Sequence, residues 1–163
     1  MDSFGQALAD ELGGVGLIMP LEVVVIRLLG AVLLCGLIGF EREWKQQSAG
    51  LRTHILVGLA AGVYSIIALE IVGQSYDESV KLDPLRIVEA VTGGVAFLAA
   101  GLIVFHNGQV KGLTTGAGMW LAASVGLCAG LGLWGIAVLA TALSLIVMIL
   151  LTAITDRFLR TKD

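Results

Sequence analysis

The sequence predicts an all-α membrane protein, a bundle of five transmembrane helices, from three observations. First, 57% of its 163 residues are apolar and 14% are charged, with a mean hydropathy of +0.94, whereas soluble domains contain about 25% charged residues. Second, it holds five apolar runs that can each cross about 30 Å of hydrocarbon. Third, most charged residues lie in the connections between these runs or at the two ends of the chain.

The first segment, residues 1–19, carries three acidic residues and no Lys or Arg. A secretory signal would begin with a positively charged region, so we interpret the segment as a mature, extracytoplasmic N-terminus. Phe4, Leu8 and Leu12 recur at helical spacing, which allows a short surface helix.

A transmembrane domain is expected over residues 20–155, followed by a cytoplasmic tail at 156–163. Its spans are expected at 21–40, 54–73, 86–105, 113–129 and 133–154. Pro20 suits the first turn of the first span, and Thr53 suits the N-cap of the second. Asn107 and Gly108 indicate a tight turn between the third and fourth spans.

Orientation follows from Lys and Arg, because acidic residues contribute little to it. One set of helix ends carries seven basic residues: Arg42, Lys45, Arg52, Lys111, Arg157, Arg160 and Lys162. The opposite set carries two, Lys81 and Arg86. The sequence therefore predicts an N-terminus outside and a C-terminus in the cytoplasm.

Stripes of small residues predict where the helices approach one another, since close packing replaces the hydrophobic force between helices in lipid. The stripes are Gly58/Gly62, Gly93/Phe97/Gly101 with Ala96/Ala100, Gly112/Gly116 and Ala122/Gly126/Gly130. Packing within the chain is the commoner use of such stripes. Five helices with short loops offer little interior, so we expect one stripe to form a homodimer interface.

Several function classes find no support. The net charge of −3 leaves no basic face for nucleic acid. Neither a GxSxG nor an HExxH motif occurs, and Cys35 and Cys128 are isolated in apolar runs. We therefore expect a protein without enzymatic activity and without a cofactor. Bound Mg²⁺, through Glu41 and Glu43 or the 77–83 loop, remains an alternative, although acidic connections are usually only solvated.

A first candidate site is an intramembrane charge cluster of Arg27, Arg86 and Glu89, which fall at comparable depth. Arg27 lies about 10 Å into the first span at 1.5 Å per residue. A charge at such depth normally has a partner, so Arg27 is expected to pair with Glu89. The pair would serve an ion pathway or a purely structural role; alternatively, Arg27 extends outward to water.

A second candidate site is a cluster at the predicted cytoplasmic face: Glu41, Arg42, Arg52, Thr53, His54, Thr114 and Thr115. Glu41 and Arg52 are expected to bridge the first two helices. The cluster is dense enough for a structural lock or for a docking surface, and the lock is favoured.

Four segments, RLLGAVLLCGLIGFERE, AGLRTHILV, FLAAGLIV and VKGLTTGAGMWLAASVGL, resemble the MgtC/SapB family of bacterial inner-membrane proteins, over roughly residues 23–150. The resemblance implies a five-span hydrophobic domain connected with growth in scarce magnesium, acid adaptation and, in pathogens, survival inside macrophages. It implies a regulatory role, and a membrane protein such as the proton-driven ATP synthase as partner.

The family pattern matches Arg27, Gly36, Gly39, Glu41, Arg42, Gly50, Leu51, Arg52, Thr53, Phe97, Gly101, Gly112, Leu113, Thr114, Thr115 and Trp120. Ala96 and Ala99 stand where the family usually has glycine, so they are expected to add methyl groups to a close-packed face. Several members continue into a soluble domain; this sequence stops at Asp163, so we expect the hydrophobic domain alone.

Two hypotheses follow. The first is a non-enzymatic regulator that contacts another membrane protein. The alternative is a magnesium or proton transporter whose pathway is lined by Arg27, Glu89 and their neighbours. A dry bundle packed through glycine favours the first, and a continuous wet path favours the second.

Overall fold

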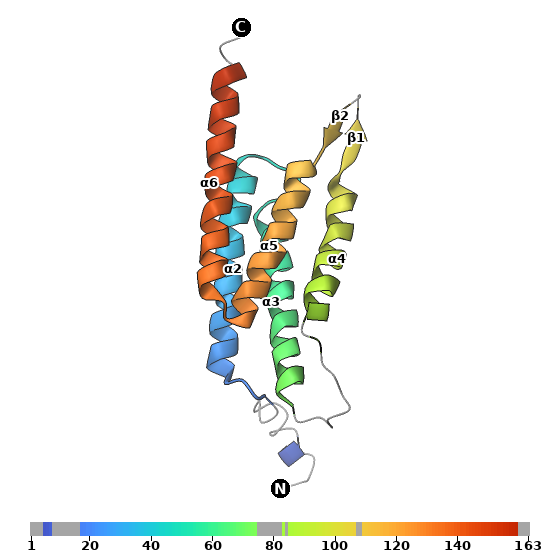
Figure 1. Cartoon of the computed structure of the whole chain (residues 1–163), viewed down its shortest axis with the longest axis vertical. Helices are drawn as coiled ribbons and strands as arrows, with labels where there is room; N and C mark the ends of the chain where they lie inside the picture. Colours follow the sequence, from blue (N-terminus) through green and yellow to red (C-terminus); the bar gives the residue numbers. More distant parts are fainter. Residues whose placement is uncertain (1–4, 8–16, 75–82, 84, 107–108, 160–163) are drawn as a thin grey trace.

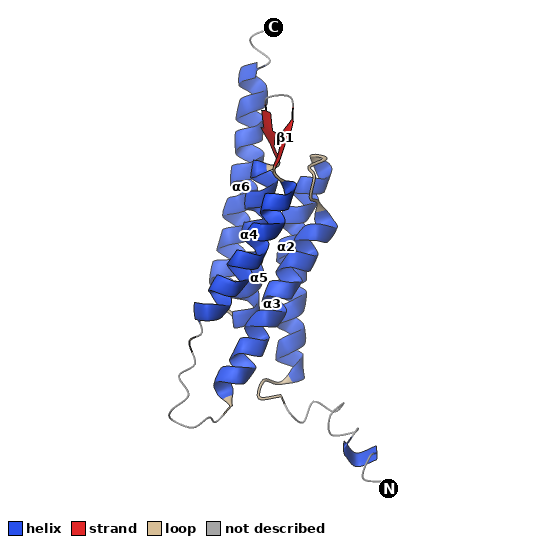
Figure 2. Ribbon diagram, turned by 90° about the vertical axis from the view of Figure 1, so that its right-hand side faces the viewer, coloured by secondary structure: helices blue, strands red, loops and turns tan. Residues whose placement is uncertain are grey.

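Five long helices form one bundle in the computed structural model, which describes residues 5–7, 17–74, 83, 85–106 and 109–159 (Figures 1 and 2). They are α2 (Leu21–Trp44), α3 (Leu51–Gly73), α4 (Leu85–Leu102), α5 (Leu113–Leu131) and α6 (Trp134–Leu159). An antiparallel hairpin of β1 (Val104–His106) and β2 (Gln109–Lys111) joins α4 to α5. All five helices are long and apolar enough to cross a membrane, which confirms the predicted fold class.

The spans lie where the sequence predicts them, with different ends. α2 continues one turn past residue 40 because Glu41 and Arg42 are buried in its last turn. α4 ends at Leu102 because the chain turns into the hairpin, in which Val104 pairs with Lys111. Strand pairing thus replaces the last turn of the third expected span.

The N-cap predicted at Thr53 is wrong. Gly50 precedes the first helical residue of α3, and Thr53 lies in the first turn. The backbone N–H of Leu51 instead donates to Glu43 Oε2 at 2.9 Å. A carboxylate from the preceding helix satisfies this helix end, where negative charge is favourable.

Helix α5 is the centre of the bundle and contacts the other four long helices (Figure 1). Its most apolar 18-residue window has the lowest mean hydropathy of the five, 1.2, yet 61% of that window is buried, against 17% for the windows of α4 and of α6, the latter within Trp134–Leu151. In lipid the buried helix need not be the most apolar one, because association depends on close packing rather than on hydrophobicity.

The α3–α5 contact is made backbone to backbone through glycines. A Cβ atom on Gly126 would overlap the carbonyl oxygen of Gly58, and one on Gly130 would lie 2.5 Å from the carbonyl oxygen of Gly62. Two of the predicted stripes are therefore confirmed as packing surfaces within the chain.

Short polar side chains reinforce this interface. Cys35 of α2 donates from Sγ to the carbonyl oxygen of Ala122 at 3.2 Å. Ser65 of α3 bonds the carbonyl oxygens of Ala61 and Leu127, at 2.9 Å and 3.2 Å. These bonds tie α2 and α3 to α5 where the lipid offers no competing partner.

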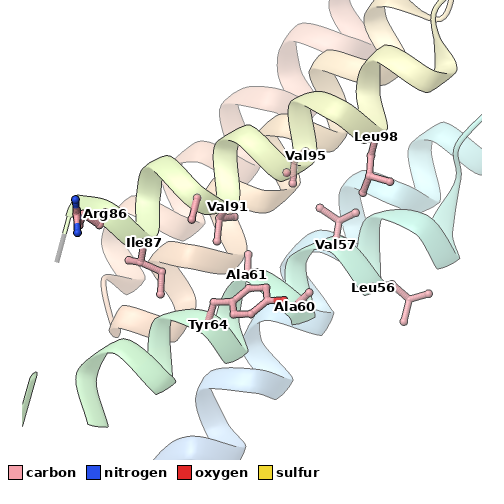
Figure 3. Close-up of a pocket in the computed structure, with 12 residues that line it drawn as sticks. Leu56, Val57, Ala60, Ala61, Tyr64, Arg86, Ile87, Val91, Val95 and Leu98 are labelled. Carbon is pink, nitrogen blue, oxygen red and sulfur yellow. The ribbon is translucent and has the colours of Figure 1, made fainter. Parts of the chain in front are cut away.

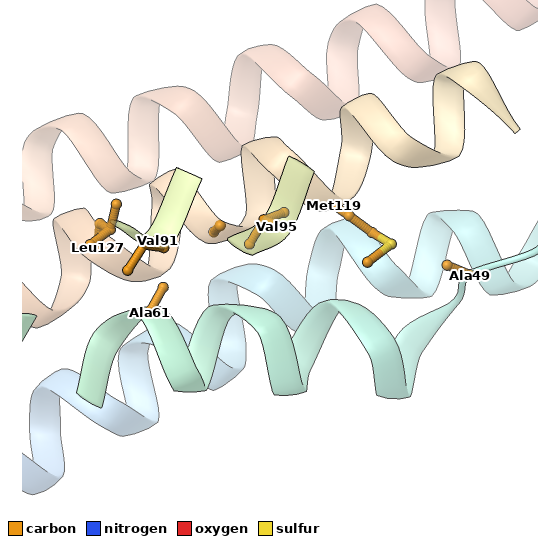
Figure 4. Close-up of a cluster of buried hydrophobic side chains, with 7 residues drawn as sticks. Ala49, Ala61, Val91, Val95, Met119 and Leu127 are labelled. Atoms are coloured by element: carbon orange, nitrogen blue, oxygen red, sulfur yellow. The ribbon is translucent and has the colours of Figure 1, made fainter. Parts of the chain in front are cut away.

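A buried apolar cluster joins α4 to this core (Figure 4). Its members are Ala49, Ala61, Val91, Val95, Met119, Ala123 and Leu127. Only Val91 and Val95 come from α4, one turn apart. The helix is thus held along a single narrow face.

The stripe on α4 faces outward. A Cβ atom on Gly93 or Gly101 would meet nothing within 4 Å, and Phe97 is 82% exposed. Ala99 does add its methyl group to a tight contact, since a Cβ on Gly116 would lie 3.2 Å from it. At Ala96, which is exposed, the expectation of crowding is wrong.

Several predictions fall on residues outside the described part of the chain. Residues 5–7 form a helical turn, and the rest of the surface helix expected before residue 17 lies outside the described residues. So do the turn at Asn107 and Gly108 and most of the loop at 75–84. α6 continues to Leu159, within the expected tail.

Candidate functional site

A buried polar group, which we call the connector lock, lies where α2, α3 and α5 meet beside the α2–α3 connection. Its members are Glu41, Arg42, Gln47, His54 and Thr115. Glu41 and Arg42 come from the last turn of α2, His54 from the first turn of α3 and Thr115 from the first turn of α5. Except for Gln47, these side chains are buried.

The centre of the lock is an ion pair between adjacent residues. Arg42 Nε donates to Glu41 Oε2 at 2.6 Å, with both side chains less than a tenth exposed. Arg42 also lies in the last turn of α2, where a cation favours the helix dipole. Among the described residues this is the one ion pair. The predicted Glu41–Arg52 bridge is wrong, because Glu41 pairs within its own helix and Arg52 is exposed.

The connection itself is closed by short-range bonds. Gly50 leaves room for the Glu43 carboxylate that caps α3, since a Cβ there would overlap it. The backbone N–H of Gln47 donates to the carbonyl oxygen of Arg42 at 3.0 Å. Gln46 has a φ of 52°, the left-handed conformation that allows this tight reversal.

His54 is fully buried beneath this connection. Its Nδ1 donates to the carbonyl oxygen of Gly50 at 2.8 Å, because a carbonyl can only accept. Nε2 is then an acceptor in the neutral ring, and it faces Gly118, where a Cβ would lie 3.3 Å away. His54 Nε2 and Glu41 Oε1 have no hydrogen-bond partner among the described residues.

The predicted cytoplasmic-face cluster thus separates into two layers. Glu41, Arg42, His54 and Thr115 are buried, whereas Arg52 and Thr114 are exposed and Thr53 is half-buried. Thr115 Oγ1 lies 3.5 Å from Gln47 Oε1, a weak contact between α5 and the connection. The inner layer is buried, and only the outer layer reaches the surface of the described chain.

The structure does not bring together the three members of the predicted intramembrane cluster. Arg27 Nη1 donates to the carbonyl oxygen of Gly130 at 2.8 Å, near the end of α5. The predicted Arg27–Glu89 pair is wrong, since Glu89 is exposed on α4. Arg86 is also exposed there. Carbonyl oxygens at a helix C-terminus attract an Arg side chain, just as a carboxylate would. The C-terminal end of α5 lies within hydrogen-bond distance of Arg27.

Glu70 has a role that the sequence analysis missed. Its carboxylate accepts the backbone N–H groups of Ile18 and Met19, at 2.7 Å and 2.9 Å. It thereby fixes the chain just before Pro20, where α2 begins. Its position near the end of a span gave no signal of a partner 52 residues earlier in the sequence.

The described residues contain no group of three or more His, Cys, Asp or Glu side chains that could hold a metal ion. Glu41 and Glu43, the candidates for Mg²⁺, serve an ion pair and a helix cap.

Five helices that can span a membrane define a multi-pass helical membrane protein, and the connector lock lies at one end of this bundle. The MgtC family matches residues 28–157, and the chain belongs to that family. It is accordingly a multi-pass protein of the bacterial inner membrane.

Curated relatives agree with this assignment. The chain is 35% identical over 136 residues to "Putative magnesium transporter YhiD" of Escherichia coli strain K12, covering 83% of this chain and 63% of YhiD. It is 38% identical to "Protein MgtC" of Salmonella typhimurium strain 14028s over 82% of this chain and 54% of that protein. "Protein MgtC" of Brucella abortus strain 2308 is also 38% identical, over 75% of this chain and 48% of that protein.

The chain therefore spans about half to two thirds of the length of these relatives. No solved structure matches it.

Proposed function

We propose that this magnesium-related membrane protein is a non-enzymatic regulator that acts by contacting another membrane protein and does not conduct ions itself. The family and the names of the curated relatives support the link to magnesium homeostasis. Acid adaptation and virulence belong to the same proposal, through the family resemblance.

The tight α3–α5 interface carries the proposal. A conducting path through one protomer would need a polar lumen between helices, but Gly58 and Gly62 pack directly against Gly126 and Gly130 there. The buried hydroxyls of α6 are also engaged: Thr141 and Ser144 each bond a carbonyl oxygen of their own helix, both at 2.8 Å. Both observations favour a dry, closed bundle.

The exposed residues at the α2–α3 connection form the docking surface in this proposal. Trp44 is 76% exposed; Lys45, the next residue in the chain, and Arg52, in the first turn of α3, are exposed as well. An aromatic ring with basic neighbours is typical of interaction hot spots. The lock beneath would keep this surface in one conformation, and an integral protein such as the proton-driven ATP synthase is the partner class that the family resemblance favours.

Self-association belongs to the same proposal. The outward stripe of α4, with Gly93, Phe97 and Gly101, is not used for packing within the described chain. A second copy can approach such a surface closely. We propose a homodimer through this face. Disulfide trapping in membranes tests it: an Ala96→Cys variant should form the cross-linked dimer more readily than Leu143→Cys on the exposed face of α6. Equal trapping of the two variants would indicate random collisions instead.

Magnesium or proton transport is the second candidate, because one relative is named "Putative magnesium transporter YhiD". Its pathway would then run between protomers, past the exposed side chains of Arg86 and Glu89 on α4.

Flux in liposomes separates the two candidates. We expect the purified chain, with insertion confirmed, to give no Mg²⁺ or proton flux above empty vesicles. Flux that disappears in Glu89→Gln or Arg86→Gln while the protein stays folded would overturn the regulator proposal.

A growth assay then tests the docking surface, using cells that lack their own family member and grow in scarce magnesium. We expect Trp44→Ala and Arg52→Ala to lose function while still inserting into the membrane, and Leu143→Ala on the exposed face of α6 to retain it. Normal growth with both Trp44→Ala and Arg52→Ala would show that these residues do not form the docking surface.

A further inference from the structure

A large hollow of the described molecule is a groove between α3 and α4, with a volume of about 800 Å³ (Figure 3). It forms because these two helices touch little and each leans on α5 instead. Small residues line its floor: Ala60 and Ala61 on α3, and Ala90 and Gly94 on α4. The volume lies in the range of small-molecule sites.

The groove is apolar along its length and polar at one end. Its lining runs from Arg86 at the start of α4 to Leu98 on the same helix, and from Tyr64 to Leu56 along α3. Twelve residues from Arg86 to Leu98 give a length of about 18 Å at 1.5 Å per residue. One leaflet holds about 15 Å of the roughly 30 Å hydrocarbon core. The groove therefore matches a single acyl chain, whereas a spanning partner helix would occupy the whole core.

Two charges of opposite sign mark the polar end. A smaller cavity of about 200 Å³ shares Arg86 with the groove and is also lined by Asp83. The guanidinium of Arg86 has no carboxylate partner among the described residues. Asp83 uses Oδ1 to accept the backbone N–H of Leu85 at 3.0 Å. Glu89, one turn further along α4, lines neither cavity.

An Arg suits a phosphate, to which it donates charge-assisted hydrogen bonds, and a carboxylate suits an ammonium group. Phosphatidylethanolamine carries both groups on one headgroup, and its acyl chains have the length of a leaflet. We propose that the groove binds one phosphatidylethanolamine molecule, with the phosphate at Arg86, the ammonium group at Asp83 and one acyl chain along the floor between α3 and α4.

Adjacent glycines provide a matched test. A Cβ on either Gly93 or Gly94 would meet nothing within 4 Å, so both positions accept a larger side chain. Gly94 lines the groove and Gly93 does not. Gly94→Leu should therefore fill the groove, and Gly93→Leu should leave it open.

Native mass spectrometry of the full chain, purified in mild detergent and offered phosphatidylethanolamine and phosphatidylglycerol in equal amounts, measures the bound lipid. We expect one phosphatidylethanolamine on the original chain and on Gly93→Leu, about tenfold weaker retention in Arg86→Gln, and none in Gly94→Leu. Equal retention by all four proteins, or preferential binding of phosphatidylglycerol, would overturn the proposal.

Thermal unfolding gives a second readout that does not depend on the lipid surviving purification. Added phosphatidylethanolamine should raise the Tm of the original chain and of Gly93→Leu, because a ligand stabilises the state that binds it. The same addition should not raise the Tm of Gly94→Leu. A rise of equal size in both leucine variants would show that the groove is not the site.

Discussion

The two sides of this bundle use the same residue type for opposite purposes. On the packed side, where α2, α3 and α5 meet, glycines let backbones touch, as at Gly58 and Gly126. On the open side, the outward face of α4, Gly93 and Gly101 meet no other part of the described chain. The difference shows that a glycine stripe marks a potential close contact, and that only the tertiary arrangement decides whether the chain itself fills it.

The two sides also differ in whether their residues stabilise the fold or are available for binding. The packed side carries the buried ion pair and the bonds of Cys35 and Ser65 to backbone carbonyls. The open side carries exposed charges and the apolar groove. Changes on the packed side should therefore reduce stability, and changes on the open side should alter what the protein binds.

Removal of a charge should give the largest difference in stability between the two sides. Arg42→Met leaves the buried Glu41 carboxylate without its partner, and we expect a loss of about 3–5 kcal/mol in the free energy of unfolding. Glu89→Gln, on the open side, should change it by less than about 0.5 kcal/mol. Reversible unfolding in mixed micelles measures both; similar values for the two variants would abolish the distinction.

The effect of an added methyl group on the free energy of unfolding should have opposite signs on the two sides. Gly126→Ala forces a Cβ against the backbone of Gly58 and should cost about 1–3 kcal/mol. Gly93→Ala meets open space and should raise stability by up to about 1 kcal/mol, because alanine favours the helix. The same unfolding assay applies, on protein diluted in detergent to the monomer so that the face proposed for the homodimer is free. Destabilisation of the monomer by Gly93→Ala would mean that this face packs within the chain.

Loss of a hydroxyl should have a smaller effect. Ser65→Ala removes a buried bond from α3 to the carbonyl oxygen of Leu127, which we expect to cost about 1 kcal/mol. Thr92 bonds only carbonyl oxygens of its own helix, α4, so Thr92→Ala should be close to neutral. Thermal melting in detergent can rank the two variants, and a lower Tm for Thr92→Ala than for Ser65→Ala would contradict the comparison.

The smallest expected difference concerns the two alanines that replace family glycines. Both Ala99→Gly and Ala96→Gly lose helix propensity equally. Ala99 also packs on Gly116, so its truncation should cost about 0.8 kcal/mol more, the value of one buried methylene. A double-mutant cycle with Gly116→Ala measures this excess, which should vanish for Ala96→Gly.

Much of the fold could be predicted from the sequence because membrane crossing is a local property. Hydrocarbon thickness sets a minimum length for an apolar run, and the backbone must satisfy its own hydrogen bonds there. The five helices were therefore located to within a few residues. Their ends were less predictable, since tertiary contacts decide them, as the Glu43 cap on α3 illustrates.

The candidate sites were only half predictable. Sequence proximity identified Glu41, Arg42 and His54 of the connector lock, because they flank one short connection. Thr115 was expected from its place at the same predicted membrane face, and Gln47 was missed. Partner choice was not predictable: Arg27 binds the carbonyl oxygen of Gly130 rather than Glu89, and Glu41 pairs with Arg42 rather than Arg52. A backbone acceptor leaves no mark in a sequence, so charge pairing alone suggested the wrong partners.

The sequence by itself thus determined that this protein crosses the membrane five times and where its charged groups gather, because both depend on the composition of short segments. The tertiary structure alone decided that α5 is the centre, that the α4 stripe faces outward and that a groove separates α3 from α4. These features depend on which helix faces meet, and close packing between helices decides that rather than how apolar each helix is.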